Sequence, residues 1–537
     1  MKYLDTTIAY SKYDEKFRKY YDRYYFSLRK EYLNVIDQNF YKKIDLDFLV
    51  SSVSEKNISS SYVFHNICLY YSINKFLNNK KIDTIFVENQ FLKKNIKNFY
   101  NGKVEVLNDK KISIINIFKI ILKHFLVFFV SKIICRKKII RGKINLVDIF
   151  ITSNDLKIDR YYKDYFLDKK SYYHIPTFVN MNLRKIINCL FFFNKKNYII
   201  KNQFLTFKDI LYSVNFTFRV DKIKIKKIFF KKLDIKDLIT RELYLRENLN
   251  ASITGLQNYL FAKNLKQKNI EIKSVLNWCE NSIVDKGWNY GFRLFFPRIK
   301  TYGYQGYFVE KKFSSLDITS NEFKAKTCPE YIMIVGQIIK RSRSEFVKKI
   351  KFIYTKAFRF EYLFHKKFYK KKINNKIIIL LNLEEETCIE IIDKIKKTQF
   401  AKNMNTIFIK EHPLLRLNQF YHEALPKNFK IINGSFYDVI KQFKVIITSG
   451  SSSSVYESLL LGAKVIFPIN DHYDNLNLEL LDVPKSYYKV CNNIQELDKH
   501  IHLYLNQNIK HFKYYDNKNK LKNSINDKKN NNFFDKI

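Results

Sequence analysis

From Lys376 onward the sequence alternates between short apolar runs and segments with helical spacing, and this alternation restricts the possible folds most strongly. The runs are rich in Ile, Val and Phe and are typical of strands buried on both faces. Alternating strands and helices with short connections form a parallel sheet covered by helices. This part therefore predicts a doubly wound α/β domain. We expect strands at 377–383, 406–409, 430–432, 445–447, 465–468 and 487–490, and helices at about 390–398, 415–424, 436–442, 454–461, 473–481 and 494–505.

A run of hydroxyl and glycine residues joins the strand at 445–447 to the next helix. It comprises Ser449, Gly450, Ser451, Ser452, Ser453 and Ser454. The N–H groups and dipole of a helix N-terminus favour an anion, so the run predicts a phosphate site. Glu457, one turn further on, is placed to reach a neutral group such as a ribose hydroxyl. The alternative interpretation is a serine-rich N-cap on an ordinary helix.

A second candidate element, Lys410-Glu411-His412-Pro413, follows the strand at 406–409. A histidine at the carboxyl end of a parallel strand points into the crevice where open α/β sheets bind ligands. A histidine that only caps the next helix would give the same pattern. Taken together with the serine run, it predicts one anion site at one edge of the sheet.

These two elements resemble the HP and Ser-Ser motifs in the carboxy-terminal domain of GT-B glycosyltransferases. The resemblance is to bacterial sialyl- and polysialyltransferases and to CDP-glycerol glycerophosphotransferases, and it covers roughly the last third of the chain. It implies that His412 and Ser451 to Ser453 bind the donor's phosphate and that Glu457 contacts the ribose. It also implies a CMP- or CDP-linked donor and no further cofactor. The whole chain is similar to surface carbohydrate biosynthesis proteins through the segments 87–90, 278–281 and 303–307.

The chain departs from these families in two places, and it also departs from the alternative family of sugar-nucleotide 2-epimerases. The acidic D/E-D/E-G element of sialyltransferases is missing from the amino-terminal half, since Glu384-Glu385-Glu386 lies in the other half. Gln305 is followed by glycine, where related capsule enzymes have histidine. A sugar-nucleotide 2-epimerase of the same fold usually has a Gly-Gly pair and two adjacent glutamates after the strand. The single Glu457 favours a transferase over that alternative.

The composition describes a basic globular protein. The 537 residues include 97 Lys+Arg and 51 Asp+Glu, a net charge of +46, and 46% are hydrophobic. Codon bias and attraction to polyanions are both explanations of the charge. Because the charge is spread along the chain, nucleic acid is not an expected partner, although a non-catalytic membrane- or nucleic-acid-binding protein remains the second alternative. Seven isolated cysteines and no apolar leader predict a reducing, cytoplasmic location and no metal site.

The amino-terminal half predicts a second Rossmann-like domain, and the two domains are expected to face a cleft. We place an acceptor-side domain with a basic aromatic insertion at 1–328, a nucleotide-donor domain at 329–505 and a basic polar tail at 506–537. An inverting transfer needs a carboxylate or histidine to take the acceptor's proton. Three acids follow apolar runs in this half: Glu280, Glu88 and Asp155. We favour Glu280, with Glu88 as its rival and a turn expected at Gly287 and Gly291. The alternative is that Glu280 caps a helix or pairs with Arg293 or Lys286.

The segment 112–134 is the most apolar of the chain. Lys119, Lys123 and His124 interrupt it, and basic residues follow at 136–143. This pattern predicts a helix that lies on an anionic membrane surface rather than one that spans it, and the alternative is a helix packed on the sheet.

The sequence thus predicts a metal-independent glycosyltransferase. It would move a sugar or polyol phosphate from a nucleotide-activated donor to a surface polysaccharide or lipid-linked acceptor, peripheral to the inner face of the plasma membrane.

Overall fold

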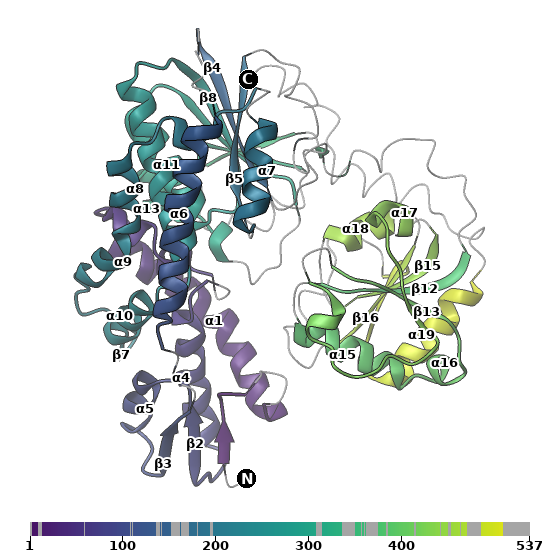
Figure 1. Cartoon of the computed structure of the whole chain (residues 1–537). Helices are drawn as coiled ribbons and strands as arrows, with labels where there is room; N and C mark the ends of the chain where they lie inside the picture. The colour runs from purple at the N-terminus through teal and green to yellow at the C-terminus, as the bar shows by residue number, and fades with distance from the viewer. Residues whose placement is uncertain are drawn as a thin grey trace.

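The computed structural model places two α/β regions in one chain (Figure 1). The structure describes residues 3–8, 13–57, 60–107, 109, 111–135, 140, 142–151, 162, 171–179, 181–193, 197–307, 314–335, 350–355, 357–358, 360, 374–382, 385–412, 415–440, 442–448, 453–461, 463–469 and 485–507.

The carboxy-terminal region is a parallel sheet, as the alternation predicts. Its strands are β12 (Asn374–Leu380), β13 (Ile407–Lys410), β14 (Phe429–Ile431), β15 (Phe443–Thr448), β16 (Lys464–Pro468) and β17 (Tyr488–Cys491). Among the described residues they are ordered β14-β13-β12-β15-β16-β17, all parallel. In chain order this is the doubly wound arrangement 3-2-1-4-5-6. The strand order reverses between β12 and β15, where such sheets bind ligands.

Helices cover both faces of this sheet. Alternate residues of β12 point to opposite sides: Ile377 and Ile379 into one buried cluster, Ile378 and Leu380 into another. The first cluster includes side chains of α15 (Glu385–Lys396), α16 (Gln399–Lys402) and α19 (Ile494–Asn506), and the second includes α17 (Phe436–Ile440). The helix expected at 415–424 is wrong, because only the short 3-10 helix η7 (Leu417–Gln419) forms there. The helix expected at 473–481 lies outside the described residues.

The amino-terminal region contains a second large parallel sheet. Its strands are β4 (Ile144–Ile151), β5 (Tyr172–Phe178), β8 (Ile272–Trp278), β9 (Lys300–Gln305), β10 (Tyr331–Ile334) and β11 (Lys351–Tyr354), in the order β11-β10-β9-β8-β4-β5. The order reverses between β4 and β8. Because β10 pairs with both β9 and β11, this sheet continues to Tyr354, beyond the boundary expected at Pro329. The change from one large sheet to the other falls between Tyr354 and Asn374.

A small third sheet lies at the amino-terminal end of the chain (Figure 1). It consists of β1 (Tyr3–Asp5), β2 (Thr84–Val87) and β3 (Lys103–Val106), all parallel. It carries α1 (Glu15–Phe40), α4 (Val63–Leu77) and α5 (Gln90–Ile96). The expected amino-terminal domain is therefore built on two sheets, and Glu88 and Glu280 leave different ones.

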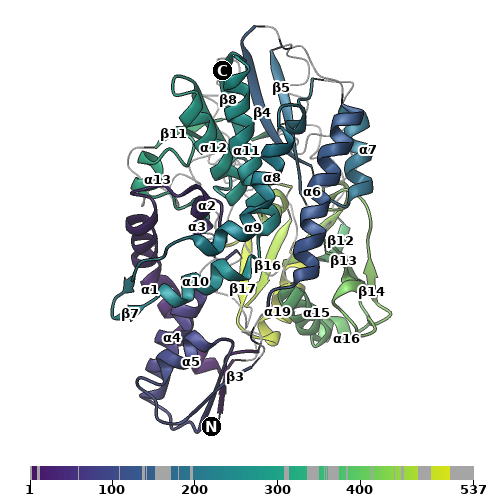
Figure 2. The ribbon, with the colours of Figure 1, turned by 60° about the vertical axis from the view of Figure 1, so that its left-hand side comes forward.

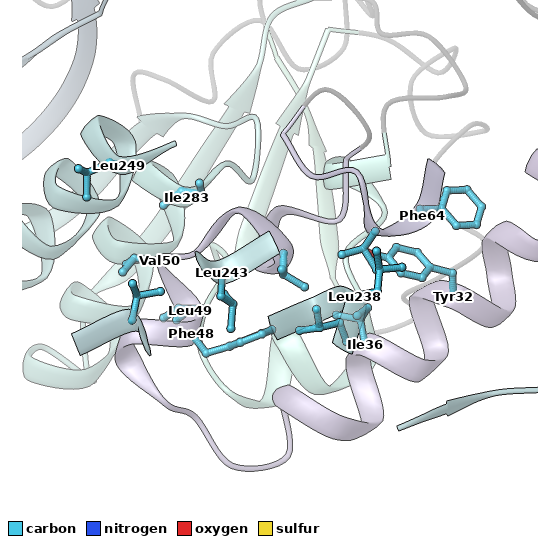
Figure 3. Packing of buried hydrophobic residues seen from close by; sticks show 14 of the residues in the cluster. Tyr32, Ile36, Phe48, Leu49, Val50, Phe64, Leu238, Leu243, Leu249 and Ile283 are labelled. Carbon is cyan, nitrogen blue, oxygen red and sulfur yellow. The ribbon is translucent and has the colours of Figure 1, made fainter. Parts of the chain in front are cut away.

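One hydrophobic core joins the small sheet's helices to the large sheet (Figure 3). Tyr32 of α1 stacks on Phe64 of α4, with ring centroids 4.7 Å apart, and Phe48 of α2 (Leu46–Leu49) and Val53 of α3 (Ser52–Glu55) belong to the same core. The other side comes from α10 (Lys236–Leu245), α11 (Leu249–Gln267) and α12 (Ile283–Phe295). α10 and α11 are separate helices because the chain breaks at Arg246, which has a left-handed φ of 53°.

The turn expected at Gly287 and Gly291 is wrong. Both glycines lie inside α12, where they let α11 approach closely. A Cβ at Gly287 would lie 2.0 Å from the Gly255 carbonyl oxygen, so no larger residue fits.

Helix α6 (Ile114–Ile134) runs along the outside of the amino-terminal region, beside α7 (Leu183–Phe193) and α8 (Phe207–Val214) (Figures 1 and 2). The remaining elements are α9 (Phe216–Arg219), the β6–β7 hairpin (Phe229–Phe230 and Leu233–Asp234), α13 (Ser320–Lys324) and the 3-10 helices η2 (Lys201–Gln203), η3 (Val220–Lys222) and η4 (Ser314–Leu316).

Candidate functional site

The two predicted motifs leave the carboxy-terminal sheet at the same edge. Leu380 at the end of β12 is in register with Lys410 of β13 on one side and with Thr448 of β15 on the other. Two strand spacings therefore separate Lys410 from Thr448, about 10 Å. Thr448 also donates through its hydroxyl to the Leu380 carbonyl, 3.2 Å away. His412 and the serine run thus flank the point at which the strand order reverses.

Two helix N-termini follow the strands at this point, and they differ in charge. α15, after β12, has Glu385 and Glu386 in its first turn, and the residues between Leu380 and Glu385 include no glycine. α18 (Ser453–Leu460), after β15, has no acid in its first turn. A phosphate is repelled by the glutamates of α15 and attracted to the uncompensated N-terminus of α18. The residues after β12 do not carry the glycine-rich fingerprint that dinucleotide-binding sheets have after their first strand. The start of α18 therefore remains the predicted position of the anion.

The loop after β13 is organised by Glu411 rather than by His412. The Glu411 carboxylate accepts from the Arg416 guanidinium at 2.9 Å and from the Leu417 N–H at 2.7 Å. The His412 carbonyl accepts from the Leu415 N–H at 3.1 Å, so the backbone turns sharply there. Both His412 and Lys410 are half-buried. Burial, together with the charge of Arg416, lowers the pKa of the Lys410 ammonium.

Part of the serine motif can be placed. Ser453 and Ser454 form the first turn of α18, and Glu457 lies one turn later with its side chain buried, 5% exposed. Pro413, Ser449, Gly450, Ser451 and Ser452 lie outside the described residues, as does Asp155. Their assignment to a phosphate site stays a prediction.

Glu280 follows β8 at the reversal point of the amino-terminal sheet. Its carboxylate accepts from the Trp278 indole at 2.9 Å, and the Tyr307 ring stacks on that indole with centroids 5.1 Å apart. The cap of α12 is Ser282, with Asp285 completing the capping box. The ammonium of Lys286 forms an ion pair with Glu322, and the Arg293 guanidinium donates to the Cys328 carbonyl. The interpretation of Glu280 as the cap of α12 is therefore excluded.

Asp285 is the residue in this area that sequence reasoning missed. It accepts from the Glu280 N–H at 2.9 Å and from the Asn277 amide at 2.8 Å, and it is almost fully buried. Burial, followed by the charges of Glu280 and Asp148, raises the pKa of Asp285 to about 8. The spacing Ser282-x-x-Asp285 is the signal that could have found it, because it marks a helix start.

Glu88 lies just after a strand of the small sheet, and its charge acts on Tyr13. It follows β2 and is half-buried. Burial, and then the charges of Glu88, Asp5 and Glu386, raise the pKa of Tyr13. Glu386 belongs to α15, so Glu88 and the start of α15 both act on the same phenol.

No group of three or more His, Cys, Asp or Glu side chains that could hold a metal ion occurs in the described part of the chain. The expected metal independence stays a prediction. The seven cysteines are buried free thiols.

Comparison with known proteins gives no sequence match, either to a protein-family model or to a curated protein. Solved structures match weakly. A glycosyltransferase from Rickettsia africae has a TM-score of 0.38 and 11% identity over 72% of this chain and 95% of its own. Anabaena Alr3699/HepE, in complex with UDP and glucose, has a TM-score of 0.41 and 10% identity over 72% and 96%. The UDP-N-acetylglucosamine 2-epimerase from Rickettsia bellii has a TM-score of 0.39 and 10% identity over 72% of this chain and 95% of its own. Similarities of this strength do not assign a function.

Proposed function

We propose that this chain is a glycosyltransferase that moves a sugar or polyol phosphate from a nucleotide-activated donor to a surface polysaccharide or lipid-linked acceptor. One observation carries the proposal. The carboxy-terminal sheet has the order 3-2-1-4-5-6, and at its reversal point an acid-free helix N-terminus follows β15 while Lys410 and His412 leave β13.

The proposed chemistry is the departure of a nucleoside phosphate. Negative charge grows on the phosphate oxygens of the leaving nucleotide as its bond breaks, either the bond to the sugar or, for a polyol phosphate, the phosphoanhydride bond. The N–H groups at the start of α18, the hydroxyls of Ser451 to Ser454 and the side chains of His412 and Lys410 would stabilise that charge. Because these donors are held by strands and a helix, little reorganisation is needed during the reaction. Glu457 would orient the nucleoside through a ribose hydroxyl.

The acceptor's proton needs a base from the amino-terminal region. Two residues are proposed. The position of Glu88 at the end of β2, where it is half-buried, supports Glu88. The position of Glu280 after β8, half-buried and with its carboxylate held by the Trp278 indole, supports Glu280.

A nucleotide panel tests the proposal. We expect CMP or CDP to raise the melting temperature more than UDP or GDP, and a chelator to leave the shift unchanged. His412→Ala should weaken binding about tenfold without lowering the melting temperature of the ligand-free protein, because a half-buried crevice histidine adds little to a core. A protein whose melting temperature does not respond to any of the four nucleotides would contradict the proposal. Conversion of a nucleotide-sugar without an acceptor would instead identify the epimerase.

A further inference from the structure

Helix α6 has two faces that differ in what they contact. The inner face is attached to the protein by buried polar groups. His124 is hydrogen-bonded to Asn250 at 3.1 Å and to Gln257 at 3.2 Å, both on α11. Burial, followed by the charge of Lys123, lowers the pKa of His124 to about 4, so the ring is neutral at physiological pH. Further along, the Asn202 amide donates to the Ser131 hydroxyl at 3.2 Å.

The outer face is an apolar stripe. We call it the outer stripe: Ile115, Phe118, Leu122, Leu126, Phe129 and Ile133. Its members recur every three or four residues, so they line one side of a helix. Their exposed fractions run from 37% for Leu126 to 83% for Ile133. Exposed apolar side chains in one continuous row are unusual on a monomeric protein and mark a binding surface.

The outer stripe continues onto α8. The Phe129 and Phe207 rings lie 6.1 Å apart, and Phe207 also approaches Phe125 at 5.8 Å. Phe207 and Leu211, one turn apart on α8, are both exposed. The apolar surface is therefore wider than a single helix face.

The charge around this surface is mainly positive, although α8 also carries Asp209, whose carboxylate accepts from the Asn264 amide. Between positions 110 and 147 the chain has ten Lys or Arg and no Asp or Glu. Among the described residues, Lys119 and Lys132 are exposed on α6 and Lys208 is exposed on α8. Because the whole chain carries a net charge of +46, a second copy of it would be repelled. A partner surface with negative charge above an apolar layer would match both the apolar outer stripe and the positive charge around it.

We propose that the outer stripe, with Phe207 and Leu211, docks the protein on an anionic lipid bilayer, with α6 lying in the plane of the interface. By length and composition alone, α6 is also the described helix that could cross a membrane, with a mean hydropathy of 1.9. Its inner face argues against crossing, because His124 and Ser131 are bound to polar groups of the protein body. Interfacial docking needs only the outer face, and the lysines at its border contact lipid phosphates.

Vesicle flotation of the full-length protein tests the proposal. Phosphatidylcholine vesicles are compared with vesicles that also contain phosphatidylglycerol. We expect binding to the anionic vesicles, release by high salt, and little binding to the neutral ones. Phe118→Gln/Leu122→Gln should lower binding by about tenfold or more, because two apolar side chains are removed from the interface.

A matched variant separates this surface from general hydrophobicity. Met404→Gln/Leu503→Gln changes two side chains that are 61% and 40% exposed on the carboxy-terminal region, and it should bind as the unchanged protein does. Equal binding to neutral and anionic vesicles, or an equal loss in the matched variant, would overturn the proposal. Membrane fractions that resist both salt and alkaline carbonate would show a crossing helix. A dimer that Phe118→Gln/Leu122→Gln dissociates would show that a second copy covers the stripe.

Discussion

Glu322 is a buried carboxylate of the amino-terminal region that forms ion pairs with two buried lysines. Its carboxylate forms ion pairs with Lys56 and Lys286, at 2.5 and 2.9 Å, and all three side chains are fully buried. The Thr319 N–H and hydroxyl also donate to it. Burial alone would raise the pKa of Glu322, but Lys286 and Lys56 lower it to about 2. Glu322 joins α13 to α3 and α12.

Replacing Glu322 by Gln should destabilise the protein by about 3 to 5 kcal/mol, because two buried lysines lose their carboxylate. The folded pKa lies below the usual value of 4.5, so the contribution of the carboxylate is present above pH 4.5 and is lost as the pH falls toward 2. Denaturant unfolding at several pH values should show the difference between the two proteins shrinking by about 3 kcal/mol over that range. A difference independent of pH would contradict this account.

Turnover measurements on glutamine variants distinguish Glu88 from Glu280 as the proposed base. Glutamine keeps the shape of each side chain but cannot take a proton, so the variant at the true base should lose about a hundredfold or more in kcat. Donor affinity, measured in parallel, should stay unchanged in both. We expect the loss in one of the two variants and not in the other, and that variant identifies the base. Full activity in both variants would exclude a carboxylate base at either position.

At the scale of elements, the strands were predictable and some connections were not. All six strands of the carboxy-terminal sheet lie within a few residues of their expected positions, because buried parallel strands are unbroken runs of Val, Ile and Phe. The helix expected at 415–424 failed, since Glu411 binds Arg416 and Leu417 and stabilises a turn instead. β5 was missed: Pro176 obscures its pattern, although an edge strand tolerates proline. Long-range pairing, which placed β10 and β11 in the first sheet, has no local signal.

The α11–α12 contact provides a test at the same scale. Alanine is a better helix former than glycine by about 1 kcal/mol, so Gly→Ala inside a helix usually stabilises. At Gly287 the new methyl group would overlap the Gly255 carbonyl, and we expect a loss of about 3 kcal/mol or more. At Gly291 the nearest atoms are 3.0 to 3.2 Å away, so the gain and the strain should nearly cancel. Thermal unfolding of the two variants compares them directly, and equal melting temperatures would refute the close packing.

For the whole molecule, the candidate site follows from topology more than from any one motif. The sequence identified the serine run and His412, and the strand order then showed that both leave the same edge beside the reversal point. The acidic first turn of α15 depends on where that helix begins in the folded chain, so it was not predictable from the pattern. The central claim is that the start of α18 binds the donor's phosphate.

Calorimetric titration with Ser454→Asp tests that claim most directly. An acid in the first turn favours the helix, so this variant should fold normally, yet its carboxylate would repel a phosphate. We expect CDP to bind at least about tenfold more weakly, while cytidine, which has no phosphate, binds as it does to the unchanged protein. The matched variant Gln495→Asp places the same charge at the same position of α19, after the edge strand β17, and should bind CDP normally. Unchanged affinity of Ser454→Asp for CDP would contradict the account.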